Sequence, residues 1–447
     1  MKEIIDYAVK KFVRSGADDV VATMASNRTN QIKFVNSKII SSNEWDSVDA
    51  SFFVTFNKKV IMTSLKNLTK KSADETVKKV VSFSKNAVPN KEYNGIAEGP
   101  FKYKKIEDVY DKKIMMLEEK TADIVNDSTN VAMKNGAKRC SGVLETQYDR
   151  TYLVTTNEVR AEDEGTRIYF SIRSFTDKNA SGHKVAVSRM LKYFNPEKTA
   201  DESAEIAVMA KNPEHIVAGK YDMIFAPLPF ANIIEHLGSG ASIFSVESGL
   251  SCLNGKLGKK IAPEKFALTD DGTLRNGIYS AKFDAEGVPT QKNPLIEKGV
   301  LKTYLHNTST AKKYGVKTTA NAGLISPAPH NLVVGKGGLK KEELIAGMKK
   351  GIYVTNIWYT RFQNYSTGDF STLPRDGCFL VENGRIIKSI RNIRINENLL
   401  NMMANISQIG SDLTAIKGWE VETPVVLPHI IVRNVSITKP EEVKDAD

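Results

Sequence analysis

The chain has 447 residues, of which 41% are hydrophobic and 26% are charged, and its formal net charge is +11. This composition is typical of a folded globular protein and excludes a largely disordered chain. The longest mostly apolar stretch, residues 223–234, is too short to span a bilayer and contains Pro227 and Pro229, so no membrane segment is expected. The length exceeds that of one ordinary core and predicts two or three domains.

The basic surplus and the cysteines narrow the choice of partners and of compartment. Lysines and arginines are scattered along the chain and mixed with acids, which favours a role in solubility and disfavours a nucleic-acid partner. Cys140, Cys252 and Cys378 are odd in number and far apart, so they form neither a disulfide framework nor a metal-knuckle pattern. The first residues mix acids and bases in a helical pattern that does not resemble a signal peptide. We therefore expect a cytoplasmic protein.

The first half of the chain contains an internal repeat. The pattern predicts an amphipathic helix that ends at Gly16, antiparallel strands over residues 20–62, and a helix that begins at Ser72. The same series follows again, with a helix over residues 113–135, further strands, and a helix that begins at Thr199. Each final helix start is predicted from a capping box, in which Ser or Thr is followed three residues later by Glu.

Matched residues set the spacing of the two copies. The offsets are 120, 122 and 121 residues for the pairs Gly16 and Gly136, Arg28 and Arg150, and Asn36 and Asn157. Because these marks recur in the same order at nearly the same offset, we predict duplicated helix–antiparallel-sheet–helix units. Residues 1–95 form the first copy, an N-terminal α/β unit, and residues 96–215 form the second copy, a central α/β unit.

From residue 216 the pattern changes to short strands separated by Gly, Pro, Asn and Asp turns. It predicts a β-rich C-terminal domain over residues 216–438, interrupted by helices over 341–349 and 397–410. Residues 439–447 are charged and poor in apolar side chains, which predicts a frayed tail. The predicted fold class is therefore α+β.

Four motifs in the second half carry a family resemblance. They are Asp284-Ala-Glu-Gly-Val-Pro289 with the Leu-Ile-Glu-Lys-Gly-Val-Leu-Lys-Thr-Tyr304 run that follows it, Ser366-Thr-Gly-Asp-Phe370, Phe379-Leu-Val-Glu-Asn-Gly384 and Ile406-Ser-Gln-Ile-Gly-Ser-Asp412. In this order they resemble the motifs of the TldD/PmbA family, and the likeness extends over essentially the whole chain. The resemblance implies a two-subunit zinc peptidase that cleaves unfolded or leader peptides.

The resemblance also implies which subunit this chain is. A zinc peptidase helix needs two histidines on one face and a glutamate that activates the bound water. The family's TldD-type subunit carries H-E-x-x-x-H and a cysteine close to its C-terminus, and the PmbA-type (TldE) subunit lacks them. This chain keeps Glu235 but has Ile234 and Ser239 where the histidines would stand, and residues 417–422 contain no cysteine. We therefore expect a PmbA-type subunit with no metal site of its own, and zinc in the partner subunit.

Two functional hypotheses and their alternatives remain open on the sequence. Glu235 is a weak candidate for a retained catalytic base, and the alternative is an acid at a helix N-terminus that the helix dipole favours. Four aromatic residues close together in the sequence could line a groove for an unfolded peptide that adds to a sheet as a strand. The alternative is a hairpin that packs them in the core. These residues are Trp358, Tyr359, Phe362 and Tyr365.

The expected partner is a TldD-type paralogue in a heterodimer. The alternative is a homodimeric peptide- or protein-binding module without catalytic activity. A third reading, a gyrase-modulating or nucleic-acid-associated protein, is disfavoured by the scattered lysines.

Overall fold

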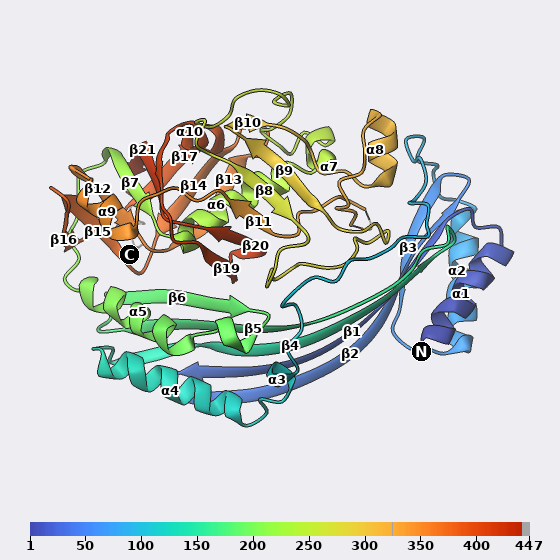
Figure 1. Cartoon of the computed structure of the whole chain (residues 1–447), viewed down its shortest axis with the longest axis horizontal. Coiled ribbons are helices and arrows are strands. Elements are labelled where there is room, and N and C mark those ends of the chain that lie inside the picture. Colours follow the sequence, from blue (N-terminus) through green and yellow to red (C-terminus); the bar gives the residue numbers. More distant parts are fainter. Residues whose placement is uncertain (324, 440–447) are drawn as a thin grey trace, which may run out of the picture.

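The computed structural model describes residues 1–323 and 325–439 and contains three sheets (Figure 1). Residues 440–447 of the predicted frayed tail lie outside the described residues. The predicted α+β class, with duplicated units in the first half and a β-rich second half, is confirmed. The predicted domain boundaries stay a prediction. Within the described residues, no helix combines the length and the apolar character needed to cross a membrane.

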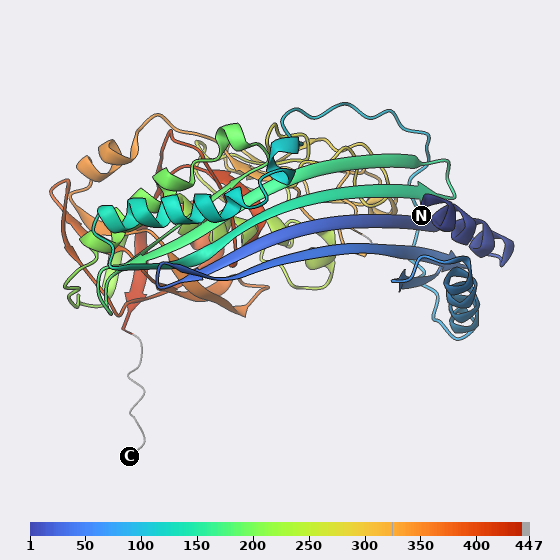
Figure 2. The same cartoon turned by 90° about the horizontal axis from the view of Figure 1, so that it is seen from below.

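The two repeat units share a single antiparallel sheet. Its strand order is β3-β2-β1-β4-β5-β6, and its strands are β1 (Val20–Val35), β2 (Lys38–Phe56), β3 (Lys59–Leu65), β4 (Arg139–Thr155), β5 (Arg160–Phe175) and β6 (Ser181–Ser188). β1 and β4 pair without a register shift from Val21 opposite Thr155 to Phe34 opposite Gly142. This pairing relates the copies by an approximate twofold rotation, and the long strands arch along the molecule (Figure 2).

Helices cover both ends of this sheet (Figure 1). At one end lie α1 (Lys2–Arg14) and α2 (Lys70–Ser84), and at the other end lie α4 (Lys120–Lys134) and α5 (Pro196–Met209). The short helix α3 (Lys112–Met115) lies between them, against β4 and β5. The aliphatic and aromatic residues of each helix pair and of the strands beneath form a separate core. The order helix, three strands, helix therefore occurs twice, although the second copy begins with two helices where the sequence predicts one.

The predicted capping boxes are wrong. α2 begins earlier than Ser72, because Thr69 provides the side-chain oxygen that accepts the Ser72 N–H at 3.1 Å. α5 begins earlier than Thr199, because Asn195 caps it and Pro196 stands at its first position, where a missing N–H costs nothing. Thr199 lies inside that helix and donates to the Asn195 carbonyl.

The second half folds into two further sheets. One has the order β10-β9-β8-β11-β20-β19 and contains β8 (Leu268–Asp271), β9 (Lys292–Glu297), β10 (Val300–Leu301), β11 (Leu332–Val334), β19 (Thr414–Gly418) and β20 (Val421–Leu427). The other has the order β13-β14-β17-β21-β7-β12-β15-β16, with β18 also paired to β21. Its strands are β7 (Gly219–Phe225), β12 (Lys350–Val354), β13 (Ile357–Asn364), β14 (Asp369–Pro374), β15 (Cys378–Glu382), β16 (Arg385–Ser389), β17 (Arg394–Asn398), β18 (Ile406–Ile409) and β21 (Ile430–Thr438).

In the described part of this half, five helices accompany the sheets: α6 (Pro227–Gly240), α7 (Ile243–Glu247), α8 (Thr308–Tyr314), α9 (Lys341–Ala346) and α10 (Leu399–Ala404). The helix predicted over residues 397–410 is wrong at both ends. Asn398 closes strand β17 and caps α10, and Ile406 already belongs to strand β18. The helix predicted over residues 341–349 ends early, at Ala346.

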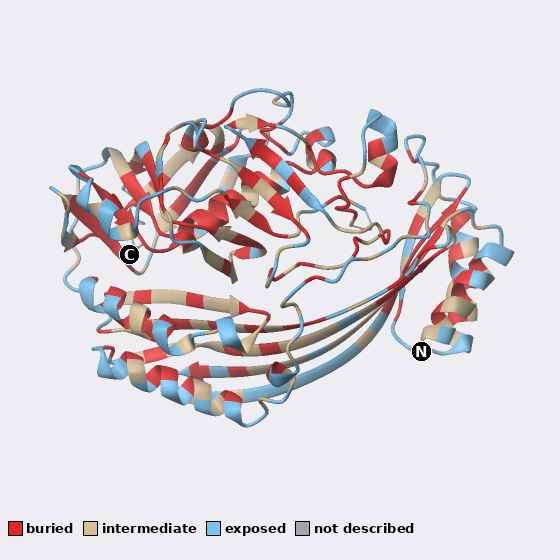
Figure 3. Cartoon of the chain, in the orientation of Figure 1, coloured by how far each residue is buried: buried red, intermediate tan, exposed pale blue. Residues whose placement is uncertain are grey.

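The largest core lies in this second half. It joins apolar residues of both C-terminal sheets and of α6. Figure 3 shows this concentration of buried residues, whereas the first part of β2 is mostly exposed. The core therefore fixes α6, and the residues that this helix presents, with little freedom to move.

Candidate functional site

Helix α6 carries the positions that matter for the family resemblance. It begins at Pro227 and contacts β20, β19 and β11 of one sheet and β7 and β13 of the other. The helix N-terminus that the sequence analysis considers for Glu235 is placed too late, because α6 begins at Pro227 and both prolines lie in its first turn, where proline is favoured. Residues 234–239 therefore form the second half of an established helix. Gly238 packs closely there, since an added Cβ atom would overlap the Leu332 side chain unless that side chain shifted.

The three positions of the zinc motif have unlike surroundings. Ile234 is fully buried in the large core, and Ser239 borders a small cavity. The Glu235 carboxylate accepts the backbone N–H of Thr423 at 2.6 Å. Burial raises the pKa of Glu235 to about 7, so the helix-dipole interpretation of this residue is wrong: Glu235 lies in the third turn and its environment disfavours the charge.

These residues do not fit a zinc ion. Catalytic zinc needs three protein donors and a water, and Ile234 has no donor atom. Glu235 is already held by β20 and is half protonated near neutral pH. Among the described residues, no three His, Cys, Asp or Glu side chains are grouped so as to hold a metal ion.

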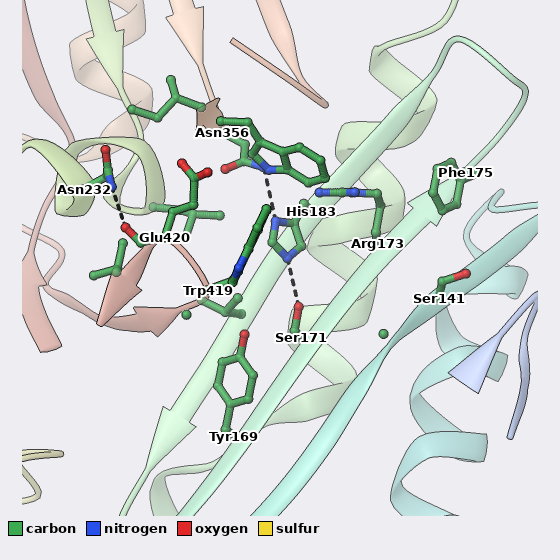
Figure 4. Close-up of a pocket in the computed structure, with 17 residues that line it drawn as sticks. Ser141, Tyr169, Ser171, Arg173, Phe175, His183, Asn232, Asn356, Trp419 and Glu420 are labelled. Atoms are coloured by element: carbon green, nitrogen blue, oxygen red, sulfur yellow. Dashed lines mark hydrogen bonds between the residues drawn. The ribbon is translucent and has the colours of Figure 1, made fainter. Parts of the chain in front are cut away.

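A cavity of about 300 Å³ lies beside the first half of α6. Its walls come from β4, β5 and β6 of the long sheet, from α6, and from the starts of β13 and β20 (Figure 4). We call it the sheet-junction cavity. Polar side chains project into it from both halves of the chain: Ser171, Arg173, His183, Asn232, Asn356 and Glu420.

A chain of hydrogen bonds fixes the histidine of this cavity. Asn356 Nδ2 donates to Asp376 Oδ2 at 2.7 Å and lies 3.2 Å from His183 Nδ1, which must then accept. The His183 proton is therefore on Nε2, which donates to Ser171 Oγ at 2.9 Å. Burial lowers the pKa of His183, so the ring is neutral. A histidine that donates to the serine cannot act as its base, and the pair is a positioning device.

The four predicted aromatic residues do not line a single groove. Trp358 borders the sheet-junction cavity and packs edge-on against Trp419 at 5.7 Å between ring centroids, with Tyr359 beside them. Phe362 and Tyr365 stack on each other at 5.1 Å and border a second cavity. The separation arises at an irregularity in β13 between Trp358 and Arg361. Their role in substrate binding stays a prediction.

The second cavity has a volume of about 230 Å³ and lies beside the second half of α6. His236 projects toward Phe362, with 4.7 Å between the rings, and burial lowers its pKa to about 4. Burial also raises the pKa of Cys252 to about 11, so its thiol is protonated and unreactive. This cavity is lined by neutral and mainly apolar groups, and Ser239 lies among them.

Sequence reasoning missed two residues of the sheet-junction cavity. His183 reads as one more histidine in a strand, because its partner Asn356 is 173 positions away. In the sequence, Trp419 is notable only as part of a segment that lacks a cysteine, yet the residue is 70% exposed and lines the cavity. No spacing rule connects such distant positions.

Comparison with known proteins identifies the family. Residues 218–439 match the PmbA/TldA metallopeptidase C-terminal domain, and residues 104–211 match the central domain. The chain is 31% identical over 218 residues to the metalloprotease PmbA of Escherichia coli, which covers 49% of this chain and 47% of that protein. It is 30% identical over 227 residues to the metalloprotease TldD homologue of Buchnera aphidicola, with 49% and 47% covered. The chain thus spans about half the length of these curated relatives.

The structure of TldE from Thermococcus kodakarensis has a TM-score of 0.87 to this chain and covers 97% of it and 100% of its own length. The two are 19% identical, so this likeness shows a shared fold. Taken with the two matched domains, it completes the assignment: this chain belongs to the PmbA/TldD metallopeptidase family.

Proposed function

We propose that this chain is the zinc-free subunit of a cytoplasmic PmbA/TldD-type peptidase, paired with a histidine-bearing TldD-type paralogue that holds the zinc. The observation that carries the proposal is the state of α6. A metal ligand at position 234 would have to reach an open site, but Ile234 is fully buried in the core. The Glu235 carboxylate accepts a backbone hydrogen bond from β20. The role left to this chain is to complete the cleft and to bind unfolded peptides.

Co-expression with the paralogue tests this role. Native mass spectrometry should show one copy of each chain and one zinc ion, and the complex should hydrolyse an unfolded peptide. Stoichiometric zinc in this chain alone would contradict the proposal, and so would a paralogue that cleaves at full rate without it. A metal-free homodimer would favour the binding-module alternative.

Glu235→Gln in this complex separates assembly from catalysis. We expect hydrolysis to change less than about twofold, because a general base contributes typically 10²-fold or more and a structural carboxyl does not. The matched control is Glu205→Gln, which removes an exposed carboxylate of α5.

A further inference from the structure

Two acceptor atoms on the wall of the sheet-junction cavity lack donors. Asn232 Oδ1 and Glu420 Oε2 are buried and have no hydrogen-bond partner among the described residues, and the Asn232 side chain is only 5% exposed. A buried acceptor left without a donor destabilises the fold, because it has lost its hydrogen bonds to water. Such atoms in native proteins are met by a ligand or by water.

Both side chains are held in place by their other atoms. Asn232 Nδ2 donates to the Glu420 carbonyl, and Glu420 Oε1 accepts the backbone N–H of Tyr359 at 3.0 Å. Tyr359 has φ of 56°, a left-handed conformation that is costly for a bulky residue. The strained residue aims its N–H at Glu420, so neither acceptor can turn away to find another partner.

The charged groups of the cavity are Glu420, the ion pair of Arg173 with Asp376, and Arg375 beside Trp358. Arg173 Nε lies 3.0 Å from Asp376 Oδ1 and forms an ion pair with it, although Nε makes no hydrogen bond among the described residues, and His183 is neutral. Glu420 is then the charged side chain whose outer oxygen is unmatched. The Trp358 ring is already contacted by the Arg173 and Arg375 guanidinium groups, at 4.1 and 5.3 Å from its centroid. Trp419 is the exposed aromatic residue of the cavity, and aromatic faces attract cations.

We propose that the sheet-junction cavity binds an ammonium group of a peptide, either its amino terminus or a lysine side chain, through Glu420 Oε2 and Asn232 Oδ1. This deepens the proposed function by naming the substrate chemistry, and it rests on that function. An ammonium group has three N–H donors, which match the two acceptors and leave one for water or a ring. The Ser171 hydroxyl, which accepts from His183, can donate its own proton to a peptide carbonyl.

Calorimetric titration of the full chain with one amidated pentapeptide tests the proposal. The peptide contains a single internal lysine and is used in four forms: unmodified, amino-terminally acetylated, with norleucine for lysine, and with both changes. The doubly changed peptide should bind at least about tenfold more weakly than the unmodified one, since hydrogen bonds to charged groups are worth roughly 1.5–3 kcal/mol. If the acetylated peptide keeps its affinity, the bound ammonium is that of the lysine. If the norleucine peptide keeps its affinity, the bound ammonium is the amino terminus.

Variants locate the effect. Glu420→Gln keeps the shape of the side chain and should weaken the unmodified peptide about tenfold while leaving the doubly changed peptide unaffected. Asn232→Ala should act in the same direction. The matched control Glu422→Gln removes an equal charge from an exposed position two residues away and should change neither affinity.

Equal affinity for all four peptides, or no binding of any of them, overturns the proposal. So does an equal effect of Glu420→Gln and Glu422→Gln. The partner subunit is absent from this titration, so its outcome is separate from that of the co-expression experiment. Ammonium binding by a chain that forms no complex would support the subsite and contradict the peptidase role.

Discussion

Replacing Glu235 by glutamine should stabilise this protein, and more so at higher pH. The carboxyl lies on a helix inside the largest core and keeps one strong contact, the Thr423 N–H. Glutamine preserves that contact, because its carbonyl oxygen can accept the same hydrogen bond. The substitution therefore removes the cost of ionising a buried acid and little else.

The size and the sign follow from the pKa. Burial raises the pKa of Glu235 from 4.5 to about 7, so the folded state holds its proton over a range where the unfolded state has lost it. Stability is greatest below pH 4.5 and falls as the pH rises from 4.5 through 7. At 1.36 kcal/mol for each pKa unit, the cost above pH 7 approaches about 3 kcal/mol.

Urea unfolding followed by tryptophan fluorescence measures this difference, since Trp358 and Trp419 lie near α6. Glu235→Gln should exceed the parent chain in stability by about 3 kcal/mol at pH 8 and by less than about 1 kcal/mol at pH 5. Glu205→Gln, at an exposed site, should show no such trend. A stability difference for Glu235→Gln that is equal at the two pH values would refute the reasoning.

Two further predictions follow from close packing and from the hydrogen-bond chain. Gly287→Ala should lower the free energy of unfolding by about 3 kcal/mol, since Gly287 has φ of 83° and a Cβ atom would overlap Val159. The control Gly249→Ala should lower it by only about 1 kcal/mol, because Gly249 has φ of 68° but open space around it. Equal losses for the two variants in thermal unfolding would contradict the packing argument. In ¹⁵N NMR, His183 should remain neutral with its proton on Nε2 from pH 8 down to pH 5.5, because burial lowers its pKa. A titration midpoint near 6.5 would contradict the neutral ring, and a proton on Nδ1 would contradict the assigned tautomer.

The repeat and the change to short strands could be predicted because both are local patterns. The offset between Gly16 and Gly136 shows that a unit recurs, since both residues end a helix in a conformation that favours glycine. The same offset says nothing about how the units join. The units join because β1 pairs with β4. Each unit has more than one strand edge that could pair, and the spacing of the repeat does not indicate which edges do.

The candidate site was less readable from sequence for two physical reasons. The two prolines in the first turn of α6 allow either a chain break or a helix start, and the surrounding core decides between them. The aromatic run from Trp358 to Tyr365 has no visible irregularity, yet the positive φ of Tyr359 sends its two halves to different cavities. Such a conformation is imposed by tertiary contacts, here the bond from Tyr359 to Glu420.

The shared sheet of the first half also constrains how the chain is made. β1 has β4 as its neighbour, and the paired residues Phe34 and Gly142 are more than one hundred positions apart. At a synthesis rate of roughly 5–20 residues per second, the β1 edge faces solvent for on the order of ten seconds while the ribosome delivers its partner. During this interval the nascent first copy has an open edge that can pair with a neighbouring chain, so translation speed between the two copies is a determinant of yield.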